Sequence, residues 1–161
     1  MSGPAPRVLV AVYAGGVAEA LAGIGAQLGY RTVLVEPDPE LRGAASWAGQ
    51  AVAAMADLDG DPELAAADVV VTDHHRDDLG EHLRDALARP VRWIGVVGNP
   101  RVEGPHVAAL AALGVAPADV ARVHRPIGLD IGSRTGPEIA VSTLAGLLAD
   151  RNGRTGGFFP Q

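Results

Sequence analysis

Residues 7–36, RVLVAVYAGGVAEALAGIGAQLGYRTVLVE, decide the fold class of this chain. The valine-rich run from Arg7 to Tyr13 is typical of a strand that is buried on both faces of a parallel sheet. A glycine turn follows, and the small residues from Val17 to Leu28 predict a helix that ends at Gly29. A second apolar run from Thr32 to Val35 predicts a second strand. Strand, turn, helix and strand in this order make a βαβ unit with a right-handed crossover.

The alternation of apolar runs and helical patterns continues along the chain. It predicts strands at 68–72 and 92–98, helices at 79–87 and 103–113, and a third strand within 51–56. We therefore predict an α/β fold, a three-layer Rossmann-like sandwich with a mainly parallel sheet, over residues 5–150. Residues 151–161 are expected to form a loose C-terminal tail.

Residues 124–140, HRPIGLDIGSRTGPEIA, contain too many glycines and prolines for a core helix. We expect a short strand at 127–131, a turn at Gly132, and a helix that has Thr135 as its N-cap and runs to Asp150. Such a turn would present backbone N–H groups to an anion. The alternative is a helix-capping turn that simply closes the domain.

Composition excludes several classes of function. The net charge of −6 argues against general nucleic-acid binding, and no apolar run is long enough for a membrane span. The first residues lack a signal-peptide pattern, so we expect a cytoplasmic protein. The chain has no cysteine, and all 13 basic residues are arginine. Thiolate metal sites, cysteine nucleophiles and lysine Schiff bases are therefore excluded, which favours a non-catalytic role.

The turn after the first strand resembles the dinucleotide fingerprint G-x-G-x-x-G/A. Gly15 stands where the backbone approaches a pyrophosphate, and Ala18 stands where the helix packs on the strand, but Tyr13 replaces the first glycine. Glu36, at the end of the second strand, could accept hydrogen bonds from a ribose. The alternative is that Gly15 and Gly16 only permit a tight connection.

Residues 73–78, DHHRDD, form the densest polar cluster of the chain. His74 and His75 could ligate a metal or act as acid–base residues, although adjacent histidines rarely point at one metal. The alternative is a loop that leads into a helix N-terminus, and we predict no metal site. Arg101, just after the strand at 92–98, suits an anionic group.

Polar and small residues follow several predicted strands, and parallel strands end at one edge of a sheet. We therefore expect one binding pocket at this edge. Its predicted residues are Gly15, Gly16, Ala18, Glu36, Thr72, Asp73, His74, His75, Gly98, Asn99, Arg101, Asp130, Gly132, Ser133 and Thr135.

The most specific resemblance lies in HRPIGLDIG (residues 124–132), which is followed by Thr135, Pro137, Glu138-Ile139-Ala140 and Ser142. This pattern closely resembles the C-terminal signature of the xanthine dehydrogenase accessory factor family, of the XdhC/CoxF type. The similarity runs from Arg7 to Asp150 and covers only the Rossmann half of those proteins. The chain departs from the family at Tyr13 and Gly16, where the family shows Gly-Ala-Gly-His-Val-Ala, and at Asn99 and Pro100, where it shows Ser and Arg.

The resemblance implies a role in enzyme maturation, because the family inserts sulfurated molybdenum cofactor into apoenzymes. We expect an accessory or chaperone protein for a molybdenum hydroxylase of the xanthine or carbon monoxide dehydrogenase type. It would be a homodimer that binds a phosphate-bearing ligand, molybdenum cofactor or NAD(P), and the apoenzyme or its maturation proteins. Two alternatives stay open: a small NAD(P)-dependent oxidoreductase that uses His74 or His75, and a structural dimer with a vestigial nucleotide pocket.

Overall fold

The computed structural model describes residues 3–161. Within them, six parallel strands form one sheet in the order β3-β2-β1-β4-β5-β6. The strands are β1 (Val8–Val12), β2 (Arg31–Val35), β3 (Gln50–Val52), β4 (Ala67–Val71), β5 (Trp93–Val96) and β6 (Val123–His124). The strand order reverses between β1 and β4, as in doubly wound sheets. The prediction of a Rossmann-like sandwich with a mainly parallel sheet is confirmed.

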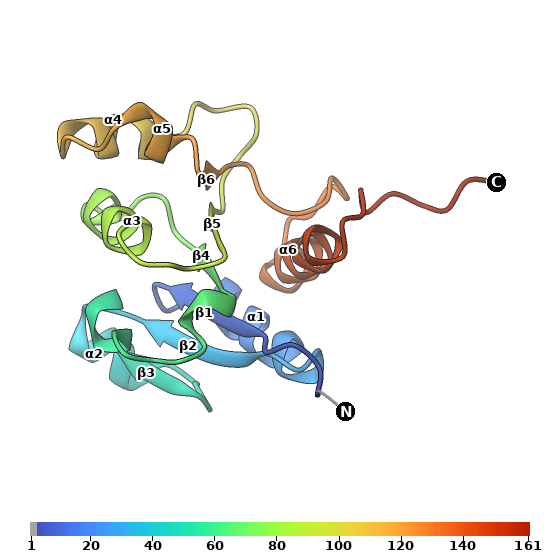
Figure 1. The fold of residues 1–161 in the computed structure, drawn as a ribbon, viewed down its shortest axis with the longest axis horizontal. Coiled ribbons are helices and arrows are strands. Elements are labelled where there is room, and N and C mark those ends of the chain that lie inside the picture. The colour runs from blue at the N-terminus through green and yellow to red at the C-terminus, as the bar shows by residue number, and fades with distance from the viewer. Residues whose placement is uncertain (1–2) are drawn as a thin grey trace.

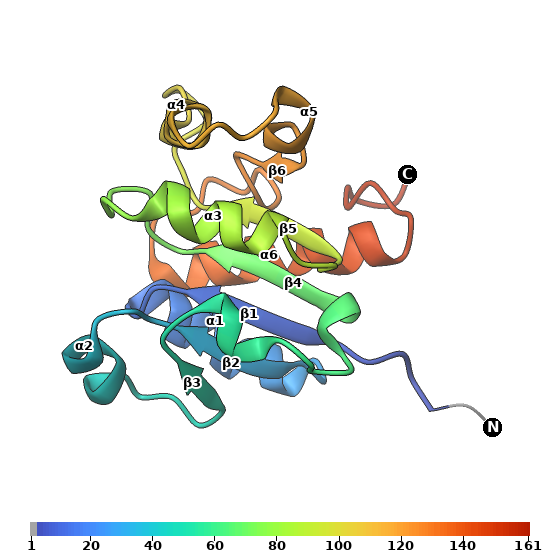
Figure 2. The same cartoon turned by 60° about the vertical axis from the view of Figure 1, so that its left-hand side comes forward.

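Helices cover both faces of the sheet, and Figures 1 and 2 show the resulting three layers. One face packs on α1 (Gly16–Gln27) and α6 (Gly136–Arg151). The other face packs on α3 (Leu79–Leu87), α4 (Pro105–Ala112) and the short 3-10 helices η1 (Met55–Leu58) and η2 (Leu64–Ala66). Two further short helices, α2 (Pro39–Ala44) and α5 (Pro117–Val120), lie in connections.

The valine-rich sequence of β1 explains its central place. Val8, Val10 and Val12 belong to the core on the α3 side, whereas Leu9 belongs to the core on the α1 and α6 side. All five residues of this strand are buried, so both of its faces are covered. Each such aliphatic side chain contributes about 1.5–3 kcal/mol on burial, which makes this strand the centre of the fold.

Two predicted strands differ from the structure. The third strand is Gln50–Val52, and Met55, from the predicted range 51–56, begins a 3-10 helix instead. The predicted strand at 127–131 is wrong, because the last strand is Val123–His124. The Leu129 N–H donates to the Ser142 carbonyl, and the Ser142 hydroxyl donates to the Leu129 carbonyl, so this segment bonds to α6 and not to the sheet.

The start and end of α6 follow the predicted signals. Thr135 is the N-cap, with Glu138 completing a capping box, and the helix ends at Arg151. Residues 154–161 form neither helix nor strand and extend away from the body in Figure 1. In this tail Phe158 and Phe159 are fully exposed. Within residues 3–161, no helix is long and apolar enough to span a bilayer.

Candidate functional site

The predicted site residues lie in loops at the carboxyl ends of the strands, and these loops form two separate regions. The Tyr13 cluster (Tyr13, Glu36, Arg76, Asp78 and His82) joins the loops after β1, β2 and β4 to α3. An open cleft lies beside the loops after β5 and β6. The first region is closed by its own side chains, and the second is accessible.

The glycine turn after β1 depends on glycine at position 15. Gly15, the N-cap of α1, has φ 155° and ψ −179°, a combination that glycine alone adopts readily. Ala18 is fully buried at the base of the helix. A Cβ atom on Gly136 would lie 3.4 Å from the carbonyl carbon of Gly16, so the N-termini of α1 and α6 are neighbours.

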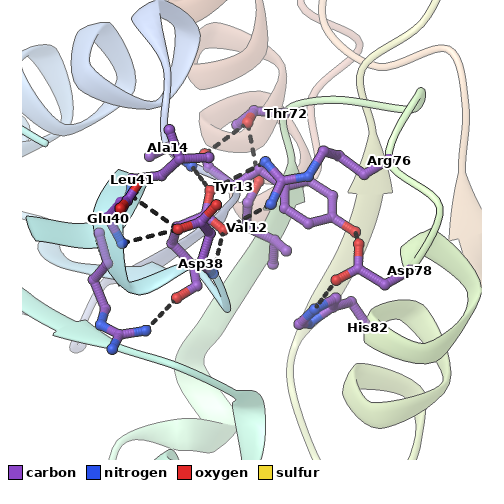
Figure 3. Close-up of polar contacts among 12 residues, drawn as sticks. Val12, Tyr13, Ala14, Asp38, Glu40, Leu41, Thr72, Arg76, Asp78 and His82 are labelled. Atoms are coloured by element: carbon purple, nitrogen blue, oxygen red, sulfur yellow. Dashed lines mark hydrogen bonds and ion pairs between the residues drawn. The ribbon is translucent and has the colours of Figure 1, made fainter. Parts of the chain in front are cut away.

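Tyr13 replaces the first fingerprint glycine and keeps a backbone suited to glycine, with φ 78°. Its side chain is fully buried, and its hydroxyl donates to Asp78 Oδ1 at 2.8 Å, as Figure 3 shows. The ring also meets the His82 ring edge-on, with centroids 5.4 Å apart. Burial and the hydrogen bond to Asp78 raise the pKa of the phenol, which therefore stays protonated.

Glu36 is fully buried, and its carboxylate is already occupied. It accepts hydrogen bonds from the backbone N–H groups of Ala14 and Asp38, each at 3.1 Å. Arg76 adds a bidentate ion pair, with Nη1 at 3.1 Å from Oε1 and Nη2 at 2.8 Å from Oε2. A ribose hydroxyl could reach this carboxylate only if Arg76 moved away.

Two further predicted residues hold local structure. The Thr72 hydroxyl lies 2.9 Å from the carbonyl oxygens of both Val12 and Tyr13, which ties the end of β4 to the end of β1. Asp73 Oδ1 accepts from the backbone N–H of His75 at 2.9 Å.

The open cleft has a volume of about 820 Å³ and holds the accessible half of the predicted site. It is lined by predicted residues His74, Gly98, Asn99, Arg101, Asp130, Gly132 and Ser133, and also by Arg134, Ile131 and Ile139. Gly15, Gly16, Ala18, Glu36, Thr72, Asp73, His75 and Thr135 lie outside its lining. The structure thus brings together the loops after β4, β5 and β6, and the glycine turn after β1 lies outside this lining.

His74 and His75 point to different surroundings. His74 lines the cleft, and its Nδ1 lies 3.0 Å from the carbonyl oxygen of Val97. His75 is exposed outside the cleft, although the two rings lie 4.0 Å apart. Across residues 3–161, no group of three or more histidine, aspartate or glutamate side chains is arranged to hold a metal ion.

The expected anion-binding turn before α6 is closed by an internal carboxylate. The backbone N–H groups of Arg134 and Thr135 donate to Glu138 Oε2 at 2.9 and 3.1 Å. These backbone hydrogen bonds lower the pKa of Glu138 and keep it charged at the helix N-terminus. The prediction that this turn presents free N–H groups to an anion is therefore wrong for these two groups.

Arg76 and Arg125 are site residues that sequence reasoning missed. Arg76 belongs to the polar stretch 73–78, and the structure pairs it with the buried Glu36. Arg125 lies between His124 and Pro126 and packs against Gly98, which lines the cleft. No sequence signal marks Arg125, because the strand is predicted at 127–131 and the structure places β6 at Val123–His124, just before this residue.

Comparison with known proteins decides the family. A family model described as the XdhC Rossmann domain matches residues 9–147. This chain belongs to the XdhC Rossmann domain family. The predicted resemblance to the accessory factors is therefore confirmed, and the region matched spans the sheet except for Val8, and most of α6.

Two relatives place this XdhC Rossmann domain among longer proteins. It is 36% identical over 77 residues to the uncharacterized protein YqeB of Escherichia coli (strain K12), covering 48% of this chain and 14% of that protein. The fold matches a solved structure of a xanthine dehydrogenase from Bacillus halodurans, with a TM-score of 0.68 and 22% identity, over 92% of this chain and 45% of that one. At this identity the structural match shows a shared fold. The XdhC Rossmann domain spans less than half the length of either relative.

Proposed function

We propose that this XdhC Rossmann domain is a non-catalytic accessory protein for the maturation of a molybdenum hydroxylase of the xanthine or carbon monoxide dehydrogenase type. In this role it holds a phosphate-bearing ligand in the cleft beside the loops after β5 and β6. The family match over residues 9–147 supports the accessory role. The partner would be the apoenzyme or one of its maturation proteins. A homodimer and a cytoplasmic location stay predictions.

The observation that carries the choice of ligand is the contrast between the closed Tyr13 cluster and the open cleft. A dinucleotide lies across both sides of the point where the strand order reverses, here between β1 and β4. On one side of that path Gly15 and Gly16 are exposed, but the Glu36 carboxylate, which would accept from a ribose, is already paired with Arg76. A pterin cofactor with one phosphate needs only the side that is open, which favours molybdenum cofactor over NAD(P).

The donor groups of the cleft fit the phosphate and ring of such a cofactor, and not its metal. Arg101 and Arg134 line the cleft and suit an anion, and Asn99 and Ser133 add side chains that can donate hydrogen bonds. The chain has no cysteine to ligate molybdenum or to carry a persulfide. The role we propose is therefore to bind and deliver, with the sulfur chemistry supplied elsewhere.

The apolar rim of the cleft fits contact with a partner protein. Ile131, in the cleft lining, is 53% exposed, and Val102, in the loop after β5, is 58% exposed. Exposed apolar residues around a polar pocket are a common feature of protein interaction sites. We propose that the partner approaches this rim when the ligand is transferred.

Thermal unfolding with defined ligands tests the proposal. Molybdenum cofactor, released anaerobically from a molybdoenzyme, should raise the Tm of the full chain, and NAD⁺ at the same concentration should leave it unchanged. A ligand at one hundred times its Kd stabilises the folded state by about 2.7 kcal/mol, which such a measurement detects. If molybdenum cofactor gives no shift, the proposed function is wrong and a structural dimer with a vestigial pocket becomes the better reading.

A small oxidoreductase is the second candidate, and the position of His74 favours it. The Val97 carbonyl oxygen accepts at Nδ1, so Nδ1 carries the proton and Nε2 is left as a base beside the cleft. This candidate requires NAD(P)(H)-dependent turnover that is lost in His74→Ala and kept in His75→Ala.

A further inference from the structure

Three buried nitrogen atoms beside the cleft have no hydrogen-bond acceptor among residues 3–161. They are Nε and Nη2 of Arg125 and Nδ1 of His106. The His106 side chain is only 7% exposed. Buried polar groups in folded proteins are nearly always hydrogen-bonded, and a buried guanidinium edge without a partner is costly.

The unpartnered edge of Arg125 is the one that binds oxyanions. Its Nη1 donates to the Val102 carbonyl oxygen at 2.8 Å, so one side of the guanidinium is fixed. The N–H groups on Nε and Nη2 lie parallel on the opposite edge, which is the arrangement that grips a carboxylate or phosphate with two hydrogen bonds. The fixed side therefore orients the free edge in advance.

Three part-buried arginines of this fold meet a buried carboxylate, whereas Arg125 meets none. Arg76 pairs with Glu36, and Arg92 and Arg151 both pair with Asp68. None of the salt bridges within residues 3–161 includes Arg125. Burial and the positive charge of Arg125 lower the pKa of His106, which indicates an electropositive environment without a counter-ion.

The loop that covers these nitrogens is bounded by two glycines. A Cβ atom on Gly98 would collide with the Arg125 guanidinium, and a Cβ atom on Gly104 would collide with the His106 ring. Gly98 also lines the cleft, so the guanidinium lies against a residue of the cleft wall. Gly104 is the N-cap of α4, where no side chain caps the helix and no acidic residue occupies the first turn. The positive end of this helix dipole adds to the same field.

We infer that Arg125 and His106 form an oxyanion subsite at the edge of the cleft, and that the loop from Gly98 to Gly104 moves aside to admit a phosphate group. The phosphate would accept two hydrogen bonds from Nε and Nη2 of Arg125 and one from His106. The inference rests on the proposed function only for the part of the ligand that carries the phosphate. The unpartnered donors suit a phosphate group whatever is attached to it.

Titration of the full chain with inorganic phosphate tests this subsite directly. In the wild-type protein, phosphate should shift the ¹H–¹⁵N NMR signal of Arg125 Nε–H saturably and slow amide exchange in residues 98–104. Arg125→Lys keeps the charge and loses the two-pronged grip, so its Kd for phosphate should rise at least about tenfold. Arg122→Lys is the matched control, since this exposed arginine lies three residues away on the sequence and pairs with Asp119. Its Kd should stay within about twofold of wild type.

Two results would overturn the subsite: no saturable shift of the Arg125 signal in wild type, or equal phosphate affinity in wild type and Arg125→Lys. The wild-type NMR measurement decides the question even if the variant fails to fold. The proposed function fails separately. If phosphate binds at Arg125 but molybdenum cofactor has no effect on Tm, the subsite stands and the proposed function is wrong. If molybdenum cofactor binds wild type and Arg125→Lys equally well, the proposed function stands and the subsite is wrong.

Discussion

The guanidinium of Arg76 lies over the ring of Tyr13, with its Cζ atom 4.2 Å from the ring centroid. Figure 3 shows Arg76 beside Tyr13. The same guanidinium forms the bidentate ion pair with Glu36, so one side chain joins the loops after β1, β2 and β4. A cation over an aromatic ring and a buried ion pair strengthen each other here, because both depend on one position of Arg76. This joint explains why the Glu36 carboxylate is not free to accept from a ribose beside the glycine turn.

Loss of Arg76 should destabilise the fold more than loss of any surface arginine. Arg76→Ala leaves the fully buried Glu36 with two backbone donors and no cation, which should lower the free energy of unfolding by about 3–5 kcal/mol. Arg84→Ala is the control, because Arg84 is half exposed and 3.9 Å from Asp85, and should cost under about 1 kcal/mol. Urea denaturation measures both. The double variant Arg76→Ala/Glu36→Gln should recover part of the stability lost in Arg76→Ala, because it no longer buries an unpaired charge. If the effects of the two substitutions simply add, the two residues are not coupled.

Tyr13→Phe isolates the phenol hydroxyl from the ring. The variant keeps the buried ring and its contact with Arg76 but removes the 2.8 Å hydrogen bond to Asp78. We expect a loss of about 1–2 kcal/mol in the free energy of unfolding, since Asp78 keeps His82 as a partner. Tyr30→Phe is the comparison. The buried Tyr30 hydroxyl has no hydrogen-bond partner in the described chain, so its removal should lower the free energy of unfolding by less. Equal losses in the two variants would show that the Tyr13–Asp78 bond contributes nothing specific.

Much of the fold could be predicted from local pattern. The run from Val8 to Val12 is apolar at every position because both faces of β1 are covered, and that signal is visible in the sequence alone. Thr135 and Glu138 are three residues apart, so the capping box that starts α6 could be predicted too. Such features depend on neighbours in the sequence, and they agree with the structure.

The features that sequence reasoning missed depend on residues far apart. The strand predicted at 127–131 fails because Gly128 packs against Ser142 on α6, a contact that the periodicity of the loop does not reveal. Tyr13 reads as a lost fingerprint glycine, but its partner Asp78 lies 65 residues away. The lack of an acceptor for Arg125 is a property of packing, and no local pattern predicts it.

The stability of the fold should also depend strongly on Asp68, which lies on the face of the sheet opposite the α3 core. It is fully buried at the start of β4 and receives Arg92 from the loop before β5 and Arg151 from the last turn of α6. Asp68→Asn leaves Arg151 without a counter-charge and leaves Arg92 with only the exposed Asp150, so we expect a loss of about 3–5 kcal/mol in the free energy of unfolding. Asp150→Asn removes only the exposed partner of Arg92 and should cost under about 1 kcal/mol. Chemical denaturation measures the free energy of unfolding of both variants. If Asp68→Asn leaves this free energy unchanged, the ion pairs of Asp68 have no structural role.

His106 should make stability depend on pH in a defined direction. Burial and the nearby Arg125 lower the pKa of its imidazole in the folded protein, so the unfolded chain takes up this proton first as the pH falls. The contribution of neutral His106 is therefore complete above about pH 6.5 and is lost as the pH falls through the lower, folded-state pKa. His106→Gln should flatten the acid side of the curve of unfolding free energy against pH, whereas His75→Gln, in an exposed loop, should reproduce the wild-type curve. Because a phosphate bound at Arg125 would offset its charge, added phosphate should also reduce the acid loss in wild type and not in His106→Gln. Identical pH profiles for wild type and His106→Gln would show that this histidine does not lie in the electropositive environment described above.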